Sequence, residues 1–494
     1  MDNLIDGLRH SLKMHGERSF IYAEDGEYKR LTYAELHELV TRLVSELGNL
    51  GICRGMPVGI VGDNSLNWIV YDLALTQLGA VVIGLPQTLF ADNADLVKRY
   101  GLGCLLLSDA FYQRYNVSYE NVINIDSPVN AQNIVLADVE TTFSEDEISV
   151  TFSSGSSGNI KGLVISKRGA DAQIRAYKDM FDAEHGRLIV YMPFTSYQQR
   201  LYVYGAIAFG FDLVLVPPHL LFDGLVRMQP TVLMGPPILF ESLARQLAQA
   251  DTKMVRETLG GRMHIMTTGM AKIRQEAIDF FHRHGIRLCE GYGLGECGSV
   301  CVNTLGAELP GSVGKALPGT QVRLADDGEI LVAKDRPLLS RYLNEITDSQ
   351  DVQDTRFHDG WFYTGDLGNM DADGNLYVKG RKKTTLVLKD GRKFQPEPVE
   401  KALEQAIDVK RATILTSSDF QGLVIAIEQH VIDTSKVDAV KSMVKQWFTD
   451  FTGGTYLLVD VQVGDSEFTP ENGLLLRNLK LNRPAIAQHF GWEA

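Results

Sequence analysis

The segment at residues 153–162 has the residue types that bind phosphate groups. It reads SSGSSGNIKG and follows EISVTF, residues 147–152, which predicts a strand. Backbone N–H groups can turn inward in such a loop, serine hydroxyls add donors, and Lys161 adds a cation. The predicted donors are Ser153, Ser154, Gly155, Ser156, Ser157 and Gly158. The spacing differs from that of the common P-loop, and a Ser/Gly run is also typical of a flexible loop.

Four later segments follow this loop, and their types and order make the phosphate-binding interpretation far more specific. They are EGYGLGE at 290–296, WFYTGDLG at 361–368, GRKKTTLVLKDGRKFQPEPVE at 380–400 and NGLLLRNLKLNR at 472–483. Together the five segments resemble the signatures of the adenylate-forming superfamily, which includes acyl-CoA synthetases, aryl-CoA ligases, nonribosomal adenylation domains and luciferases. The resemblance extends from about residue 30 to 485. It is greatest to long-chain acyl-CoA synthetases, because of PFTSYQQR at 193–200 and MQPTVLMGPPILFESL at 228–243.

This resemblance implies an ATP site and assigns a role to individual residues. Asp366 and Arg381 match the ribose ligands, Tyr292 offers a ring to adenine, and Glu296 is a hard oxygen ligand for Mg²⁺. Lys480, carried by a closing lid, would stabilise charge that develops at the α-phosphate. The implied ATP-binding set also contains Lys161, Gly269, Gly291 and Gly293, and the implied catalytic residues are Lys480, Glu296 and Lys161. Considered singly, such residues are more often turn, core or surface residues.

The resemblance also implies a pocket for a carboxylic acid. Its predicted lining is Phe194, Ser196, Tyr197, Gly235, Pro236 and Gly269. Amino-acid-activating domains usually place an Asp in the pocket motif, and PFTSYQQR has none, so a fatty or aryl acid is expected. Ile160 and Gly295 depart from the usual Pro and Thr of the family. These departures leave open a homologue that has lost catalysis.

The strand and helix pattern predicts an α/β fold with a large N-terminal domain and a small mobile lid. Strand-to-turn units separated by helices indicate layered α/β subdomains, and short strands at about 311–380 indicate a small β-barrel-like part. We expect the adenylation core at 1–380 and a hinge at 381–383, centred on Lys383. The α+β lid is expected at 384–494.

Composition is that of an ordinary globular protein, with 45% apolar and 22% charged residues among 494. The net charge of −14 argues against nucleic-acid binding. Five scattered cysteines without a CxxC pair favour reduced thiols. The longest apolar stretch, residues 201–211, is too short to span a bilayer and predicts buried core. A cytoplasmic location is therefore expected.

The predicted function is ATP-dependent activation of a fatty or aryl acid to an acyl-adenylate, with release of pyrophosphate. The acyl group would then pass to the thiol of CoA, so ATP, Mg²⁺ and CoA are the expected cofactors. A second acceptor stays open, the phosphopantetheine of an acyl carrier protein. The basic cluster Lys382, Lys383, Lys389, Arg392 and Lys393 suits CoA phosphates and an acidic carrier equally.

Overall fold

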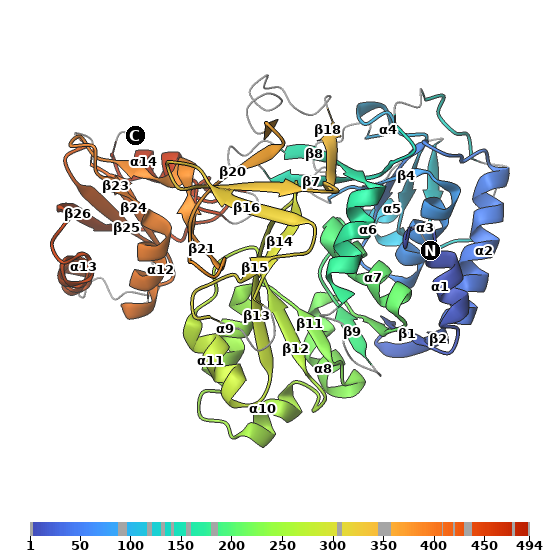
Figure 1. Ribbon diagram of the computed structural model, residues 1–494, viewed down its shortest axis with the longest axis horizontal. Helices are drawn as coiled ribbons and strands as arrows, with labels where there is room; N and C mark the ends of the chain where they lie inside the picture. Colours follow the sequence, from blue (N-terminus) through green and yellow to red (C-terminus); the bar gives the residue numbers. More distant parts are fainter. Residues whose placement is uncertain are drawn as a thin grey trace. The chain divides into compact units, whose positions relative to one another are not determined.

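The computed structural model divides the chain into two compact units (Figure 1). The first comprises residues 1–322, 332–362 and 371–376, and the second comprises 323–331, 363–370 and 377–494. The structure describes residues 3–86, 96–115, 121–129, 134–139, 143–154, 160–178, 186–303, 309–343, 357–407, 409–417, 420–428, 437–476 and 480–492. The side chains of residues 114, 115, 153, 154 and 160 lie outside this description.

The first unit contains a nine-stranded sheet whose central strands are parallel. Its order is β15-β14-β13-β12-β11-β9-β10-β1-β2, and each pair from β13 to β1 is parallel. The strands are β1 Ser19–Glu24, β2 Glu27–Thr32, β9 Arg187–Val190, β10 Asp212–Leu215, β11 Val232–Met234, β12 Ile265–Thr268, β13 Arg287–Leu294, β14 Gly298–Val302 and β15 Lys315–Ala316. Because the strands β9 to β13 run parallel, their carboxyl ends meet at one edge, where ligands of α/β sheets bind.

A seven-stranded sheet in the same unit carries the predicted phosphate loop. Its order is β18-β8-β7-β4-β3-β5-β6, with β7 and β8 antiparallel. The strands are β3 Pro57–Val61, β4 Val81–Gly84, β5 Cys104–Leu107, β6 Val122–Asn124, β7 Glu147–Ser154, β8 Ile160–Ser166 and β18 Leu339–Tyr342. The sequence predicted β7 but not strand β8, which follows the loop.

Helices cover both sheets of the first unit. They are α1 Leu8–Met14, α2 Tyr33–Asn49, α3 Leu66–Leu78, α4 Leu96–Arg99, α5 Asp109–Tyr115, α6 Lys167–Ala176, α7 Tyr197–Phe209, η4 Pro218–Leu220, α8 Leu221–Met228, α9 Pro237–Gln246, α10 Thr252–Thr258 and α11 Gln275–Arg283. Helix α2 begins at a capping box in which the Thr32 hydroxyl accepts from the Glu35 backbone N–H. Helix α7 is buried along nearly its whole length, which confirms the prediction that residues 201–211 are core.

A single apolar core connects the two sheets. It contains side chains of the seven-stranded sheet, such as Val58 and Leu106, and of the nine-stranded sheet, such as Leu188 and Leu213. Helices α3 and α7 contribute to the same core. A second core lies under α8, α9 and α11, which Figure 1 shows beside strands β11 to β13. This packing holds the strand ends of the nine-stranded sheet in fixed positions.

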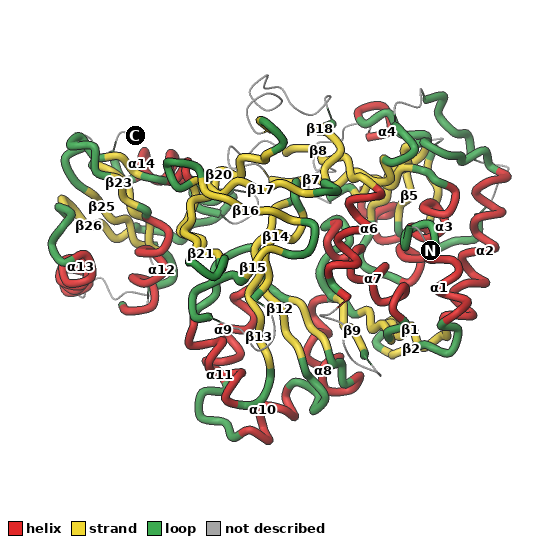
Figure 2. Tube along the Cα trace, viewed as in Figure 1, coloured by secondary structure: helices red, strands yellow, loops and turns green. Residues whose placement is uncertain are grey.

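A five-stranded sheet, with order β16-β17-β20-β19 and β21 beside β20, contributes residues to both units. Its strands are β16 Thr320–Leu324, β17 Glu329–Lys334, β19 Phe357–His358, β20 Trp361–Met370 and β21 Leu376–Arg381. The rest of the second unit is a small α+β body, seen in Figure 2 as strands beside helices α12 and α13. It contains η7 Lys382–Thr384, β22 Leu386–Val387, β23 Lys393–Phe394, α12 Pro396–Ala406, β24 Ala412–Thr416, β25 Leu423–Ile427, α13 Val437–Thr452, β26 Leu458–Val463 and α14 Arg483–His489.

The α/β fold class predicted from the sequence is confirmed. Alternating strands and helices form the first unit, and the second unit contains a smaller α+β body. In the described part of the chain, no helix is long and apolar enough to cross a membrane. No disulfide joins any of the five cysteines, all of which lie among the described residues.

Candidate active site

The predicted phosphate loop joins two strands that are paired up to its ends. Phe152 lies opposite Gly162, and Ser153 lies opposite Lys161. Hence the loop leaves and re-enters a rigid sheet, the arrangement that positions binding loops. Residues 155–159, and with them Gly155, Ser156, Ser157 and Gly158, lie outside the described residues. Their phosphate contacts stay predictions.

Lys161 and Glu296 both contact one tyrosine, Tyr342. The Lys161 Nζ atom is 5.7 Å from the centre of the Tyr342 ring, a cation–π distance. The Tyr342 hydroxyl donates to Glu296 Oε1 at 3.3 Å. Glu296 is buried, and its backbone carbonyl accepts from the Leu339 N–H at 3.1 Å. A lysine and a carboxylate predicted to bind phosphate and Mg²⁺ are thus held by strand β18.

Glycines are required where the strands of the nine-stranded sheet end. A Cβ atom on Gly269 would lie 3.3 Å from the Gly291 carbonyl oxygen, and one on Gly293 only 2.4 Å from that of Gly298. Tyr292 stands between the two β13 glycines and is partly exposed. Tyr292 therefore keeps part of its surface exposed, as the adenine prediction requires.

The residues predicted to line the acid pocket divide into two sets. Phe194 packs in the core against Trp68, with ring centres 4.9 Å apart, and Tyr197 is buried beneath the Arg200 guanidinium. Ser196 is exposed at the start of α7, while Gly235 and Pro236 lie where β11 passes into α9. The second set lies at the same strand edge as Gly269.

Two buried hydroxyl groups at this edge have no hydrogen-bond partner among the described residues. They belong to Tyr191, directly after β9, and Thr268, the last residue of β12. Burial raises the pKa of Tyr191 to about 12, so its hydroxyl is a neutral donor. The Cβ position of Gly235 is 2.9 Å from that hydroxyl. Since buried polar groups are normally satisfied, this edge is suited to a polar ligand.

A buried ion pair fixes the elements beneath this edge. The Arg200 Nη2 atom on α7 lies 2.5 Å from Asp72 Oδ1 on α3, and Arg200 Nη1 donates to Ser149 Oγ on β7 at 2.6 Å. The Tyr204 hydroxyl donates to the second Asp72 oxygen at 2.6 Å. Burial raises the pKa of Asp72 even though Arg200 opposes the shift. The network ties the acid-pocket helix to the strand that leads into the phosphate loop.

The second unit carries the other predicted ATP residues. Asp366 is buried on β20, and its Oδ1 lies 2.7 Å from Arg381 Nε at the end of β21. Lys383 is exposed in η7. Lys480 is also exposed, and its backbone carbonyl accepts from the Leu476 N–H at 2.8 Å. The hinge role of Lys383 and the domain bounds at 380–384 stay predictions.

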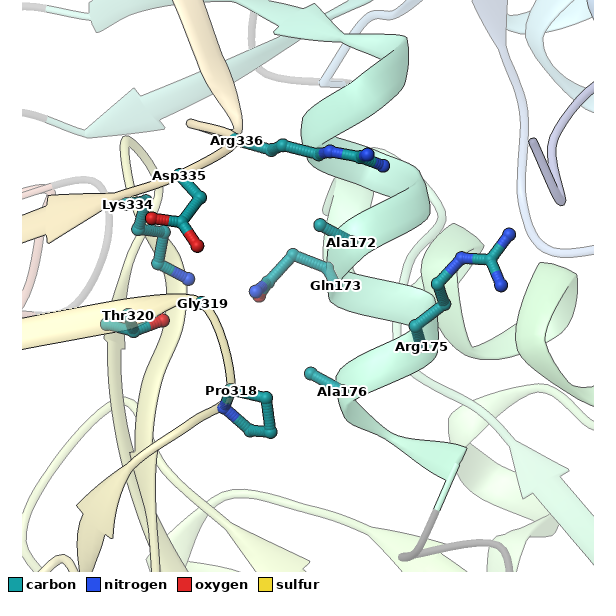
Figure 3. A pocket seen from close by; sticks show the side chains of 10 residues that line it. All are labelled: Ala172, Gln173, Arg175, Ala176, Pro318, Gly319, Thr320, Lys334, Asp335 and Arg336. Atoms are coloured by element: carbon teal, nitrogen blue, oxygen red, sulfur yellow. The ribbon is translucent and has the colours of Figure 1, made fainter. Parts of the chain in front are cut away.

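A pocket of about 280 Å³ lies elsewhere in the first unit (Figure 3). Gln173 of α6, Gly319 and Lys334 line it, and none of the predicted site residues does. The Lys334 Nζ donates to the Ser299 carbonyl at 2.6 Å, and burial lowers the pKa of this lysine to about 8. We do not place the active site there, because the pocket contains none of the residues predicted to bind ATP or the acid.

Comparison with known proteins identifies the family. The family model described as "AMP-binding enzyme" matches residues 8–336, about two thirds of the chain. The chain belongs to the AMP-binding enzyme family. The resemblance to adenylate-forming enzymes predicted from the sequence is thereby confirmed.

Relatives of this AMP-binding enzyme have named activities. The long-chain-fatty-acid–CoA ligase FadD15 of Mycobacterium bovis is 24% identical, covering 83% of this chain and 79% of that protein. The peroxisomal long chain acyl-CoA synthetase 6 of Arabidopsis thaliana is 23% identical, with 97% and 83% covered. The o-succinylbenzoate CoA synthetase of Bacillus subtilis, solved with its acyl-adenylate, has a TM-score of 0.78 at 19% identity, and covers 97% of each chain. The amide bond synthetase McbA of Marinactinospora thermotolerans has a TM-score of 0.78 at 20% identity, covering 98% and 100%. These structures share the fold.

The residues of this AMP-binding enzyme also fit Mg²⁺ bound with ATP. Among the described residues, no group of three His, Cys, Asp or Glu side chains could hold a metal by itself. Mg²⁺ commonly takes one or two protein carboxylates together with substrate phosphates and water. The Glu296 carboxylate, which shares Tyr342 as a contact with Lys161, matches that requirement.

Sequence reasoning missed two parts of this AMP-binding enzyme's site. Tyr342 was not predicted, because only the pairing of β18 with β8 brings it to Lys161 and Glu296. Asp72 was not predicted either, because 128 residues separate it from Arg200. The arginine itself stood in the PFTSYQQR motif, and an Asp inside the apolar helix LNWIVYDLALTQL was the available signal for its partner.

Proposed function

We propose that this AMP-binding enzyme joins a carboxylic acid to CoA through an acyl-adenylate. The observation that carries the proposal is that Tyr342 contacts both Lys161, through its ring, and Glu296, through its hydroxyl, beside the strands that flank the phosphate loop. A cation and a buried carboxylate at that position suit a polyphosphate and the Mg²⁺ bound to it. The names of the relatives support an acid–CoA ligase.

In the first half-reaction the substrate carboxylate attacks the α-phosphorus of ATP. A carboxylate oxygen to phosphorus bond forms, the bond from the α-phosphorus to the bridging oxygen breaks, and pyrophosphate leaves. Lys161 binds the β- and γ-phosphates, and Glu296 would hold Mg²⁺, which neutralises phosphate charge when bound. Lys480 stabilises the charge that grows on the α-phosphate oxygens.

The nucleotide is oriented by residues of the second unit. Asp366 accepts hydrogen bonds from the ribose hydroxyls, and Arg381 positions that carboxylate through the 2.7 Å contact observed here. Holding ATP in a fixed orientation accelerates the attack by making the reacting atoms neighbours.

In the second half-reaction the thiol of CoA attacks the acyl carbonyl carbon. The carbon–sulfur bond forms, the bond to the phosphate oxygen breaks, AMP leaves, and the thiol proton passes to solvent. No protein nucleophile takes part, so the five cysteines need no catalytic role. The acid is fatty or aryl, because the pocket motif carries no acidic side chain for an α-amine.

Lys480→Ala tests the first half-reaction. We expect acid-dependent exchange of pyrophosphate into ATP to fall about 100-fold, since one stabilising donor is worth two to three orders of magnitude. The matched control is Lys389→Ala, an exposed lysine of the same unit, which should exchange as fast as wild type. Equal exchange by Lys480→Ala and wild type would remove the catalytic role of Lys480.

The acyl acceptor is tested separately. Wild type is supplied with ATP and one active acid, and then with CoA, with a phosphopantetheinylated carrier protein, or with neither. A thioester detected by mass with CoA supports the proposal. A thioester found on the carrier protein alone would assign the enzyme to the carrier-protein ligases.

A further inference from the structure

The two most exposed large apolar side chains of the described residues lie next to the predicted acid site. Met270 is 72% exposed and Ile238 is 63% exposed. Met270 directly follows Gly269 at the end of β12, and Ile238 is three residues beyond Gly235 at the end of β11. Exposed apolar groups that gather at one place mark binding surfaces more often than single scattered ones do.

Strand pairing places the two side chains at the same edge of the sheet. Strands β11 and β12 are parallel neighbours, with Met234 opposite Thr267. Ile238 is the second residue of α9, and side chains of a helix lean toward its N-terminus, here toward the strand ends. The buried face of α9 is formed by other residues, among them Phe240 and Leu243.

Met270 also has a backbone conformation that side chains disfavour. Its φ is 70°, in the left-handed region. The other described non-glycine residues with positive φ have turn or helix-end positions, such as Gln229, which ends α8. Met270 lies instead in the connection from β12 to α11, where no hairpin or helix end requires this conformation. Strained residues of this kind are found preferentially at ligand sites.

Two polar groups of this edge are the hydroxyls of Tyr191 and Thr268, which have no hydrogen-bond partner in the part of the chain that the structure describes. Both are buried, whereas Met270 and Ile238 are exposed. A site with a few buried donors and an apolar outer surface matches a ligand that has a polar end and an apolar body. A carboxylic acid with a long chain or an aromatic ring has that character.

We propose that Met270 and Ile238 form an apolar rim of the acid site and select acids by the apolar body beyond the carboxyl group. Met270 is the specificity-determining residue, and Ile238 supports it from the neighbouring strand end. The proposal rests on the proposed function, because it assumes that the acid binds at this edge.

Met270→Gly tests the rim with little risk to folding, because glycine favours a φ of 70°. Pyrophosphate release is measured for straight-chain acids from acetate to hexadecanoate and for an aryl acid. We expect kcat/KM to fall about 10-fold for the longer and aryl acids, through KM, with acetate unchanged. Two methylene groups removed from contact account for that magnitude.

Gln229→Gly is the matched control. It relieves the same kind of backbone strain at the end of α8, so both glycine variants should melt at a higher temperature than wild type. Only Met270→Gly should change the acid profile. Ile238→Ala should shift the profile in the same direction by a smaller factor.

The outcomes separate the two proposals. If wild type activates acids and Met270→Gly and Ile238→Ala have its acid profile, the rim proposal is overturned and the proposed function stands. If none of the acids tested makes wild type release pyrophosphate, the proposed function fails, and the rim proposal fails with it. A profile change that Gln229→Gly shares would assign the effect to stability and overturn the rim.

Discussion

Two arginine–carboxylate pairs of the second unit have the same chemistry and different surroundings. In the pair of β20 and β21, Arg381 makes one contact of 2.7 Å with Asp366 and keeps 42% of its side chain exposed. In the pair of α12 and α14, Arg483 makes two bonds to Glu400, of 2.6 and 2.7 Å, and is 17% exposed. Arg483 also donates to the Ile414 carbonyl.

This difference separates a residue that can meet a ligand from one that holds the fold. An arginine that makes two bonds to a carboxylate and another to the main chain has a fixed geometry. Its guanidinium is paired within the protein and is not available to a ligand. A half-exposed arginine with a single contact retains donors toward solvent. Both arginines stand in segments that resemble family signatures, so burial, and not the signature, distinguishes their roles.

The largest expected effect is on stability, from Arg483→Met. Removing one member of a buried pair leaves Glu400 charged and uncompensated, which costs about 3–5 kcal/mol. Urea unfolding followed by tryptophan fluorescence measures the loss. Arg381→Met is the matched control and should cost about 1 kcal/mol or less, because that arginine is half exposed. Equal losses from the two variants would contradict the distinction drawn here.

Asp366→Asn tests the other side of the comparison. The amide keeps the shape of the carboxylate but loses its charge, so the KM for ATP should rise about 100-fold, which corresponds to about 2.7 kcal/mol. Urea unfolding should change by less than about 1 kcal/mol. The effect is read from initial rates of pyrophosphate release at varied ATP. Glu400→Gln is the control, with the reverse pattern of a stability loss and an unchanged KM for ATP.

Much of the fold could be predicted from local sequence signals. Thr32 as an N-cap residue and the apolar spacing after it indicated α2, and short apolar runs that lead into proline or glycine turns indicated β9 to β13. These signals are contained within a few residues, so tertiary contacts are not needed to interpret them. Strand β8 was missed because its pairing with β7 is formed across a loop and not by a tight turn.

The site could be predicted only in part, for the same physical reason. The motifs around Lys161, Glu296 and Asp366 could be recognised because each is a short continuous segment and they follow one another in the order typical of the family. Tyr342 and Asp72 were not, because each acts through a partner brought to it by the fold. The sequence also could not show that Met270 takes a positive φ, since methionine rarely adopts one.

The smallest expected effect extends the comparison to a neighbour of the buried pair. Burial raises the pKa of Glu404 to about 7, and the Glu400 charge adds to the rise. Because this carboxyl group keeps its proton longer in the folded than in the unfolded protein, its stabilising contribution is complete below about pH 4.5 and disappears as the pH rises to about 7. The decrease is on the order of 3 kcal/mol. Glu404→Gln should abolish this decrease, because the amide oxygen can still accept from the Ala412 N–H and carries no charge. Urea unfolding of both proteins across this pH range measures the difference. Parallel pH profiles would show that Glu404 ionises in the folded protein as it does in the unfolded chain.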